Sequence, residues 1–245
     1  MANGWIVPDW PAPVSAAVST RLVDGASQPP FDSFNLGTRC GDDPDHVAAN
    51  RLALIDALGL QQSPCWLRQV HGTTVVRLSS SPEPVEHEAD AAVASEPGVV
   101  LAILTADCLP VLFASRDGIH IGAAHAGWRG LAAGVLEATV TAMDVPPSEI
   151  IAWLGPAIAA DSYEVGEEVR DTFVAHDPRA EAAFTESRPG HWFCDLCALA
   201  TQRLRAYGIE HIHGGGFDTF DDDCFYSYRR DLKTGRFASL IWISP

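Results

Sequence analysis

Three short stretches of the sequence carry side chains that are suited to bind a metal ion or to act as nucleophiles. His71 stands in the stretch QVHG, Cys108 in TADCLP and His125 in HAGWRG. Each stretch lies beside a predicted strand, so one sheet edge could bring the three side chains together. The gaps of 37 and 17 residues match no local ligand motif, and residues of these types at strand ends also have structural roles. Spacing alone therefore leaves a shared site as an open hypothesis.

Convergence of these side chains would make a catalytic metal centre. Two imidazoles and one thiolate suit zinc, and three protein ligands leave the fourth tetrahedral position for water or substrate. Zinc lowers the pKa of bound water to about 7 and can polarise a substrate atom. Asp107, next to Cys108, is a candidate hydrogen-bond acceptor for a ligand or a proton carrier, and a turn or capping aspartate is the alternative. Without a metal, Cys108 is a candidate nucleophile, with His125 or His71 as its base.

Two arginines could bind an anion beside such a centre. Arg129 lies between a predicted strand at 119–124 and a helix predicted to begin near Leu131, and a helix start presents free N–H groups to an anion. Arg51 falls inside the apolar stripe of a predicted helix at 44–58. An arginine that faces the core either forms a structural ion pair or reaches an anion pocket.

A second pair of arginines follows near the C-terminus. Arg229 and Arg230 are neighbours in a predicted strand, so at most one of them faces inward. Together with Arg51 and Arg129, the inward one could hold a phosphate through charge-assisted hydrogen bonds. The alternative is that all four are surface arginines of an acidic protein.

The elements that must position these residues are strands and helices in mixed order. The first helix has Asp43 as a predicted N-cap and Pro44 at its first position. The absence of a regular strand–helix alternation favours an α+β fold over a doubly wound sheet. Segment 79–88, rich in serine, proline and glutamate, is predicted as a surface loop. Hydrophobic patterns predict strands at 14–19, 75–78, 89–94, 99–104, 111–114, 119–124, 150–154, 209–213 and 237–243, and helices at 44–58, 131–143, 165–175 and 195–207.

Composition and charge exclude several classes of protein. The 245 residues are 47% hydrophobic and 20% charged, and 16 Lys and Arg against 32 Asp and Glu give a formal net charge of −16. A chain of this length buries roughly 70–75% of its unfolded surface, which excludes disorder, and its acidity argues against binding a nucleic-acid backbone. No segment resembles a signal peptide or approaches the roughly 20 apolar residues of a membrane helix. We expect a cytoplasmic protein with free thiols, a small-molecule substrate, and no nucleic-acid or membrane partner.

The three stretches and several others together resemble one protein family. This family goes by the names laccase-domain or polyphenol oxidase protein, purine nucleoside phosphorylase and peptidoglycan editing factor. The similarity runs in order from about Phe34 to the C-terminus, so membership is specific although no single motif is. Besides QVHG, TADCLPVLF and HAGWRG, the motifs that carry it are NLG at 35–37, NR at 50–51, GPAI at 155–158, YEVG at 163–166 and FYSYRR at 225–230.

The resemblance implies a zinc ion bound by His71, Cys108 and His125. It further implies a single α+β domain over residues 1–245, in which mixed β-sheets pack together and helices lie outside, and activity on purine nucleosides. Asp107 and Cys108 are the candidates for direct catalysis. The candidates for binding substrate or phosphate are Asn35, Arg51, Arg129 and Arg229.

Three functions are compatible with these residues. Phosphorolysis of adenosine or inosine to the free base and ribose 1-phosphate is the leading hypothesis, with deamination of adenosine at purine C6 as a further expectation. The alternative is a Cys–His hydrolase that edits a cell-wall precursor. A non-catalytic binding module, in which zinc only fastens the fold, predicts a closed fourth coordination position.

The supply of ligands disfavours copper oxidation. A His₂Cys set can bind copper, but a blue-copper centre usually adds a weak axial methionine, and neither of the two methionines lies in a motif. The chain offers one H-x-H pair, His211 and His213, whereas a multicopper enzyme needs many paired histidines. These histidines with Cys194 and Cys197 would form a rival zinc site, but H-x-H is shorter than the usual spacing. Structural thiols are the preferred interpretation of both cysteines.

Overall fold

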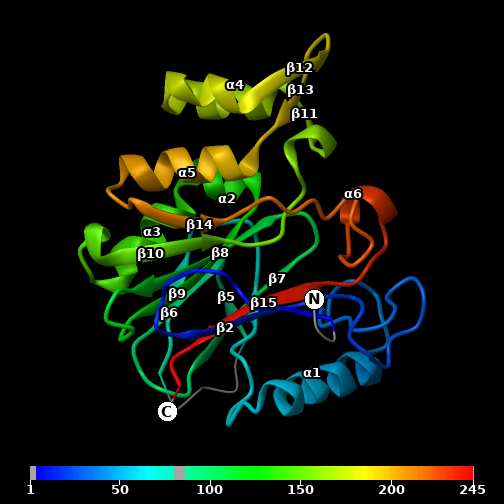
Figure 1. Cartoon of the computed structure of the whole chain (residues 1–245). Coiled ribbons are helices and arrows are strands. Elements are labelled where there is room, and N and C mark those ends of the chain that lie inside the picture. The colour runs from blue at the N-terminus through cyan, green and yellow to red at the C-terminus, as the bar shows by residue number, and fades with distance from the viewer. Residues whose placement is uncertain (1–3, 80–85, 245) are drawn as a thin grey trace.

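The computed structural model describes residues 4–79 and 86–244, and its two largest sheets pack face to face (Figure 1). The larger sheet runs in the order β14 (His211–Gly214), β10 (Ile150–Leu154), β8 (Leu109–Ser115), β9 (Ile121–Ala126), β6 (Ala91–Ala94) and β4 (Val75–Arg77). The four-stranded sheet runs in the order β1 (Trp5–Ile6), β2 (Ser15–Ser19), β15 (Phe237–Trp242) and β7 (Val100–Thr105). Two short strands, β3 (Leu67–Arg68) and β5 (His87–Glu88), form a separate parallel pair.

The central strands of the larger sheet are buried on both faces because each face meets a different layer. Along β8, Val111 and Phe113 pack in one apolar cluster with helical residues, whereas Leu112 and Ala114 pack in a second cluster with the four-stranded sheet. Successive strand residues point to opposite faces. The unbroken apolar run of β8 is therefore the pattern of a strand covered on both sides.

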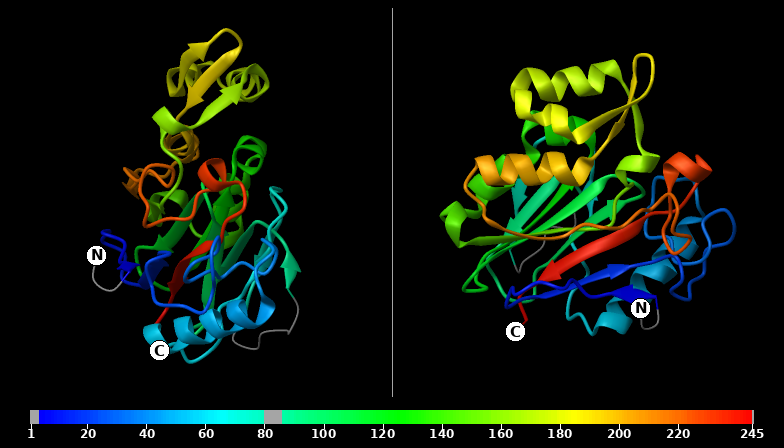
Figure 2. Two further views of the ribbon diagram at one scale, coloured as in Figure 1. Left: turned by 90° about the vertical axis from the view of Figure 1, so that its right-hand side faces the viewer. Right: turned by 45° about the horizontal axis from the view of Figure 1, so that its top comes forward.

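Helices cover the outer face of each sheet (Figure 2). On the larger sheet lie α2 (Trp128–Ala133) and α3 (Val135–Met143), and α5 (Leu196–Ala206) packs on α3. On the four-stranded sheet lies α1 (Pro44–Leu58), whose Leu54 joins an apolar cluster with strand residues. The order of layers is thus helix, sheet, sheet, helices.

The helix predicted at 44–58 is confirmed at both ends. The side chain of Asp43 accepts a hydrogen bond from the Asp45 N–H, as an N-cap does. Gly59 ends the helix in the left-handed conformation, with φ of 60°, which glycine adopts without the steric cost of a Cβ.

A smaller lobe of three strands and one helix lies beyond α5 (Figures 1 and 2). It contains β11 (Glu164–Gly166), α4 (Glu167–His176), β12 (Phe184–Arg188) and β13 (His191–Cys194). The sequence patterns did not predict the hairpin of β12 and β13, because the exposed polar residues of β12 break any apolar alternation. The usable signal was its turn, where Gly190 has φ of 74°.

The predicted α+β architecture, with packed mixed sheets and outer helices, is confirmed, but two local predictions are wrong. The helix predicted at 131–143 is two helices, because Gly134 between them adopts φ of 99°. Arg229 and Arg230 lie on the short helix α6 (Tyr228–Asp231) and not on a strand. The cause is Ser227, whose hydroxyl accepts a hydrogen bond from the Arg230 N–H and begins the helix.

Three other expectations can be compared with the structure. Of the predicted loop at 79–88, residues 80–85 lie outside the described residues. All six cysteines are free thiols, as expected. Among the helices that the structure describes, none combines the length and the apolar character needed to cross a bilayer.

Candidate metal centre and adjoining cavity

The three predicted ligand side chains meet at one edge of the packed sheets. His71 lies in the turn after β3, Cys108 in the turn between β7 and β8, and His125 near the end of β9. Their ligand atoms all lie within 4.8 Å of one another, and 3.8 Å separates the Cys108 Sγ from the His71 Nε2. Bond lengths of about 2.3 Å for Zn–S and about 2.0–2.1 Å for Zn–N would place tetrahedral ligand atoms roughly 3.5 Å apart. The donor set and its geometry therefore fit a zinc-sized ion.

Asp90, a residue that the sequence analysis missed, organises this centre. Its carboxylate is fully buried and accepts a hydrogen bond of 2.8 Å from the Nδ1 of His125. It also accepts hydrogen bonds of 3.1, 2.8 and 2.7 Å from the backbone N–H groups of Val70, His71 and Gly72. These bonds hold the turn in which His71 has φ of 62°, and they leave the Nε2 of His125 as its free ring nitrogen. A carboxylate in this position fixes the tautomer and orientation of a ligand histidine.

The electrostatics of the centre favour the ionised forms of its acidic groups. Burial raises the pKa of the Cys108 thiol, but the charge and hydrogen bonds of His125 and His71 outweigh it and lower the pKa to about 6. Burial likewise raises the pKa of Asp90, yet hydrogen bonds from His125 and the backbone hold it below its usual range. Burial lowers the pKa of His125, whereas the Cys108 thiolate and Asp90 raise it to about 9. The cluster thus attracts positive charge, which a divalent cation would supply.

Glycines of the HAGWRG stretch let the backbone approach the centre closely. A Cβ on Gly127 would lie 2.7 Å from the Cδ2 of His71 and 3.1 Å from the Sγ of Cys108. A Cβ on Gly130 would lie 2.9 Å from the carbonyl oxygen of Gly72. Gly127 therefore leaves space for two ligand side chains, and Gly130 leaves space for the backbone of the turn that carries His71.

This close approach predicts that Gly127→Ala weakens metal binding about 10-fold or more. The backbone of Gly127, with φ of −62°, accepts alanine, so the new methyl group acts by displacing His71 and Cys108. Metal affinity is measured by competition with a chelator. The matched control is Gly122→Ala in β9, whose Cβ would lie 3.2 Å from Met143 and from Thr139. Equal affinity in both variants would contradict the steric argument.

A cavity of about 470 Å³ opens beside the three ligands. Its volume lies within the range of roughly 300–1,000 Å³ that is typical of small-molecule sites. His71, Cys108 and His125 form one part of its wall. The other lining residues include Gly37, Arg39, Cys40, Gln69, Glu86, Thr105, Tyr228 and Arg236.

Asp107 lies next to Cys108, but its carboxylate is engaged elsewhere. Its Oδ1 accepts a hydrogen bond of 2.7 Å from the Thr219 hydroxyl, and its Oδ2 accepts one of 2.6 Å from the Arg229 N–H. Asp107 therefore ties the turn that carries Cys108 to the start of α6. Of the roles considered for Asp107, these contacts agree with that of a turn or capping aspartate, and the carboxylate that orients a ligand histidine is Asp90.

Asn35 and Arg51 lie behind the cavity and hold one of its walls. The amide of Asn35, which is fully buried, donates to the Gly37 carbonyl and to Asp42 and accepts from the N–H groups of Gly37 and Arg236. The Nε of Arg51 donates to the Leu36 carbonyl at 3.0 Å, and its guanidinium stacks on Trp66. Burial lowers the pKa of Arg51 to about 10. Direct contact of either residue with a substrate stays a prediction.

Arg129 and Arg229 are not among the residues that line the cavity. Arg129 is exposed and stacks on Trp128, and Arg229 stacks on Tyr163 and donates to the Glu164 carbonyl. Burial and the Cys108 thiolate raise the pKa of Tyr163, whereas Arg229 and Arg129 oppose this rise. The charges of Arg129, Arg229 and Cys108 therefore all act on the phenol of Tyr163.

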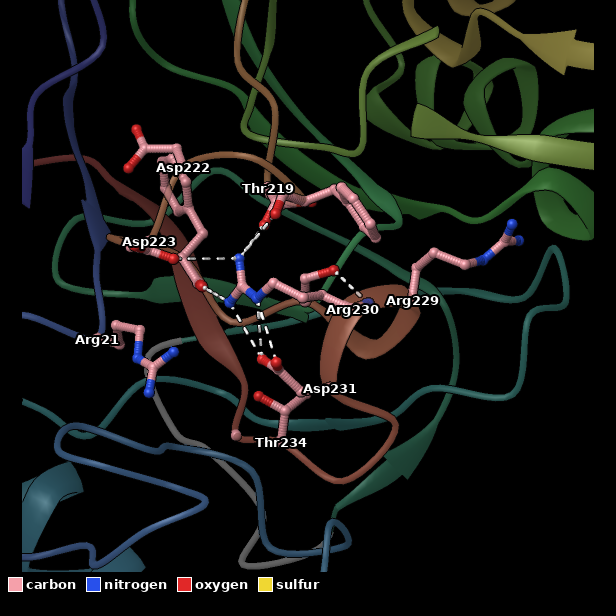
Figure 3. A network of polar contacts seen from close by, with 12 residues as sticks. Arg21, Thr219, Asp222, Asp223, Arg229, Arg230, Asp231 and Thr234 are labelled. Atoms are coloured by element: carbon pink, nitrogen blue, oxygen red, sulfur yellow. Dashed lines mark hydrogen bonds and ion pairs between the residues drawn. The ribbon is translucent and has the colours of Figure 1, made fainter. Parts of the chain in front are cut away.

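Arg230, the neighbour of Arg229, has a structural role (Figure 3). Its guanidinium donates to the carbonyls of Thr219, Phe220 and Phe225 and pairs with Asp231. Figure 3 shows the Arg229 side chain directed away from this network. The expectation that one arginine of the pair faces inward from a strand does not apply, because both lie on α6, where Arg229 is exposed and Arg230 bonds to backbone carbonyls.

The rival metal site is not assembled. Within residues 4–79 and 86–244, the three-residue group at His71 is the one cluster of His, Cys, Asp or Glu with a metal-binding arrangement. Cys194 and Cys197 do not join His211 or His213 in such a group. Burial raises the pKa of both thiols to about 12, as expected for structural cysteines.

Comparison with known proteins identifies relatives that match almost the whole chain. The chain is similar to the purine nucleoside phosphorylase of Pseudomonas aeruginosa, with 54% identity over 98% of this chain and 99% of the relative. It is also similar to the purine nucleoside phosphorylase YfiH of Escherichia coli, with 51% identity over 97% and 98% of the two chains.

Solved structures share the fold. Protein NMB0706 of Neisseria meningitidis has a TM-score of 0.94 at 45% identity, over 99% of this chain and all of that chain. YlmD of Geobacillus stearothermophilus has a TM-score of 0.92 at 30% identity, over 100% of this chain and 98% of that chain. The family model described as multi-copper polyphenol oxidoreductase laccase matches residues 15–244. The chain therefore belongs to this laccase-domain family.

Proposed function

We propose that this protein is a zinc-dependent purine nucleoside phosphorylase. The observation that carries the proposal is the cluster of His71, Cys108 and His125, which forms part of the wall of a cavity large enough for a small molecule. The names of the relatives from Pseudomonas aeruginosa and Escherichia coli support the reaction. The substrates would be adenosine or inosine and inorganic phosphate, in the cytoplasm.

We propose zinc as the metal because two imidazoles and a thiolate are its common ligands, and three of them leave a position for a reactant. Zinc would supply Lewis acidity at that position. Copper, which the family description mentions, is the alternative. The described part of the chain offers one cluster of three ligands, which supports a single ion and not the several ions of a multicopper oxidase.

In phosphorolysis, an oxygen of phosphate forms a bond to C1′ of the ribose while the bond from C1′ to N9 of the purine breaks. The electron pair of that bond goes to the purine, which takes up a proton. We propose that Arg129 and Arg229 attract phosphate toward Cys108 by their charge, in a chain that is otherwise strongly acidic. Asp107 would position Arg229 through its N–H.

Asn35 and Arg51 would contribute to substrate binding through the cavity wall that they hold. Both bond to the segment after Phe34, which continues into the lining residues Gly37 to Cys40.

We further propose adenosine as a substrate for deamination, in which water adds at purine C6 and ammonia leaves. The hydrolase alternative needs a free Cys108 thiolate, which a bound metal would not leave.

The test is release of base from inosine by zinc-loaded protein. We expect formation of hypoxanthine and ribose 1-phosphate that depends on phosphate. In His71→Ala we expect the rate of base release to fall by a factor of at least about 10³. Products are separated by liquid chromatography, and adenosine is assayed in parallel for inosine formation. Base release without a need for phosphate, or an unimpaired His71→Ala variant, would count against the proposal.

A further inference from the structure

Arg236 lies at the same sheet edge as the metal centre. It directly precedes β15, whose first residue Phe237 pairs with Thr105, the last residue of β7. The chain after Thr105 turns through Ala106 and Asp107 to Cys108. The register of two strands therefore places Arg236 beside the turn that carries a metal ligand, and both residues line the same cavity.

The Arg236 side chain is held in a fixed position. Its Nη1 donates to the carbonyls of Thr234 and Gly235 at 3.0 and 2.8 Å, and its guanidinium stacks on Tyr228. Its stem packs on Gly37, where an added Cβ would lie 2.8 Å from the Cγ of Arg236. A guanidinium that is pinned along one edge loses little entropy when its other edge binds a ligand.

Arg236 combines a free guanidinium edge with a place in the cavity wall. No described residue forms an ion pair with Arg236 or accepts a hydrogen bond from its Nε or Nη2. Arg39, the other arginine of the cavity wall, is paired with Glu86. Arg51, Arg129 and Arg229 are not among the residues that line the cavity.

Thr105 adds a neutral donor to the same wall. It is only 2% exposed, and its hydroxyl has no hydrogen-bond partner among the described residues. The Gln69 side chain is not available to a ligand, because its amide accepts a hydrogen bond from the N–H of Leu104 and donates one to the carbonyl of Leu104. A buried hydroxyl without a partner in a cavity wall is a group that a polar ligand can satisfy.

We infer that Arg236, assisted by Thr105, binds the phosphate co-substrate inside the cavity. The identification of the anion as phosphate rests on the proposed function. Guanidinium groups bind phosphate oxygens through directed, charge-assisted hydrogen bonds. Asn35, whose amide accepts the Arg236 N–H, positions this residue, and Arg129 and Arg229 act from outside the cavity.

The experiment measures inorganic phosphate binding to zinc-loaded protein by calorimetry, together with the KM for phosphate and for inosine. Arg236→Gln is expected to raise the Kd and the KM for phosphate by about 10- to 100-fold and to change the KM for inosine by less than about twofold. Arg236→Lys keeps the charge but not the fork of donors, and we expect an intermediate effect. It also tests the proposal if the Gln variant does not fold. Arg205→Gln removes an equal charge from an exposed position on α5 and is the matched control.

The outcomes separate this inference from the proposed function. Phosphate binding that is lost in Arg236→Gln but kept in Arg205→Gln supports the anion site even if wild-type protein does not cleave inosine. An unchanged Kd for phosphate in Arg236→Gln and Arg236→Lys would overturn it. A larger loss of phosphate affinity in Arg129→Gln or Arg229→Gln than in Arg236→Gln would also overturn it, and would place the anion site outside this cavity.

Discussion

Asp90→Asn is expected to weaken metal binding about 10- to 100-fold and to lower the free energy of unfolding by about 2–4 kcal/mol. The wild-type carboxylate accepts four hydrogen bonds, from His125 and from three consecutive N–H groups that begin at Val70. The amide of asparagine replaces one acceptor oxygen with a donor, so two of these buried donors lose their partner. Both histidine ligands are affected, because one bond orients His125 and the others hold the turn of His71.

The control for this prediction is Asp218→Asn. Asp218 accepts hydrogen bonds from the N–H groups of Ala159 and Phe220 and from the Ser162 hydroxyl, so it is a comparable acceptor away from the ligands. Denaturant unfolding measures stability, and chelator competition measures metal affinity. We expect both variants to be less stable and only Asp90→Asn to bind metal more weakly. Equal metal affinity in the two variants would show that Asp90 supports the fold alone.

Asp90 also shows what the sequence did and did not reveal about the site. His71, Cys108 and His125 could be predicted as one metal site because a family resemblance connected their three motifs. The spacing of the motifs along the sequence did not predict a shared site. No motif pointed to Asp90, whose partner His125 follows 35 residues later. A signal was present, because Asp90 is the one acid in the otherwise apolar run ADAAVA at 89–94. A carboxylate inside an apolar strand is buried only with partners.

The fold was predictable where local patterns agree with tertiary contacts. The helix at Pro44 combines a cap, a favourable first residue and a terminal glycine, and each acts locally. Arg229 was predicted to lie on a strand, but Ser227 and the distant Asp107 cap a helix there. The contact with Asp107 joins residues 122 positions apart, which no local pattern records. Arg236 was missed for the same reason, since its role depends on the register of two strands that are far apart in sequence.

Cys108→Ala is expected to remove the bound metal and to lower phosphorolysis about 10³-fold or more. The substitution deletes one of three ligands, and the two remaining imidazoles, whose ring centres are 4.8 Å apart, form an incomplete zinc site. Metal content is measured by elemental analysis of the purified variant. The matched control is Cys40→Ala, which removes a thiol from the same cavity wall and is expected to keep its metal.

Alkylation of Cys108 distinguishes between two roles of its thiol, that of a metal ligand and that of a catalytic nucleophile. A thiolate bound to zinc reacts slowly with iodoacetamide, so we expect peptide mapping to find Cys108 unmodified until a chelator is added. Metal-free protein should then react readily, because the two histidines favour the thiolate form. If Cys108 were instead alkylated in the metal-loaded protein, with loss of activity and retention of the metal, the thiol would be acting as the nucleophile of a hydrolase. Such a result would also leave only His71 and His125 to hold the ion, and a different third ligand would have to be found at this edge of the sheets.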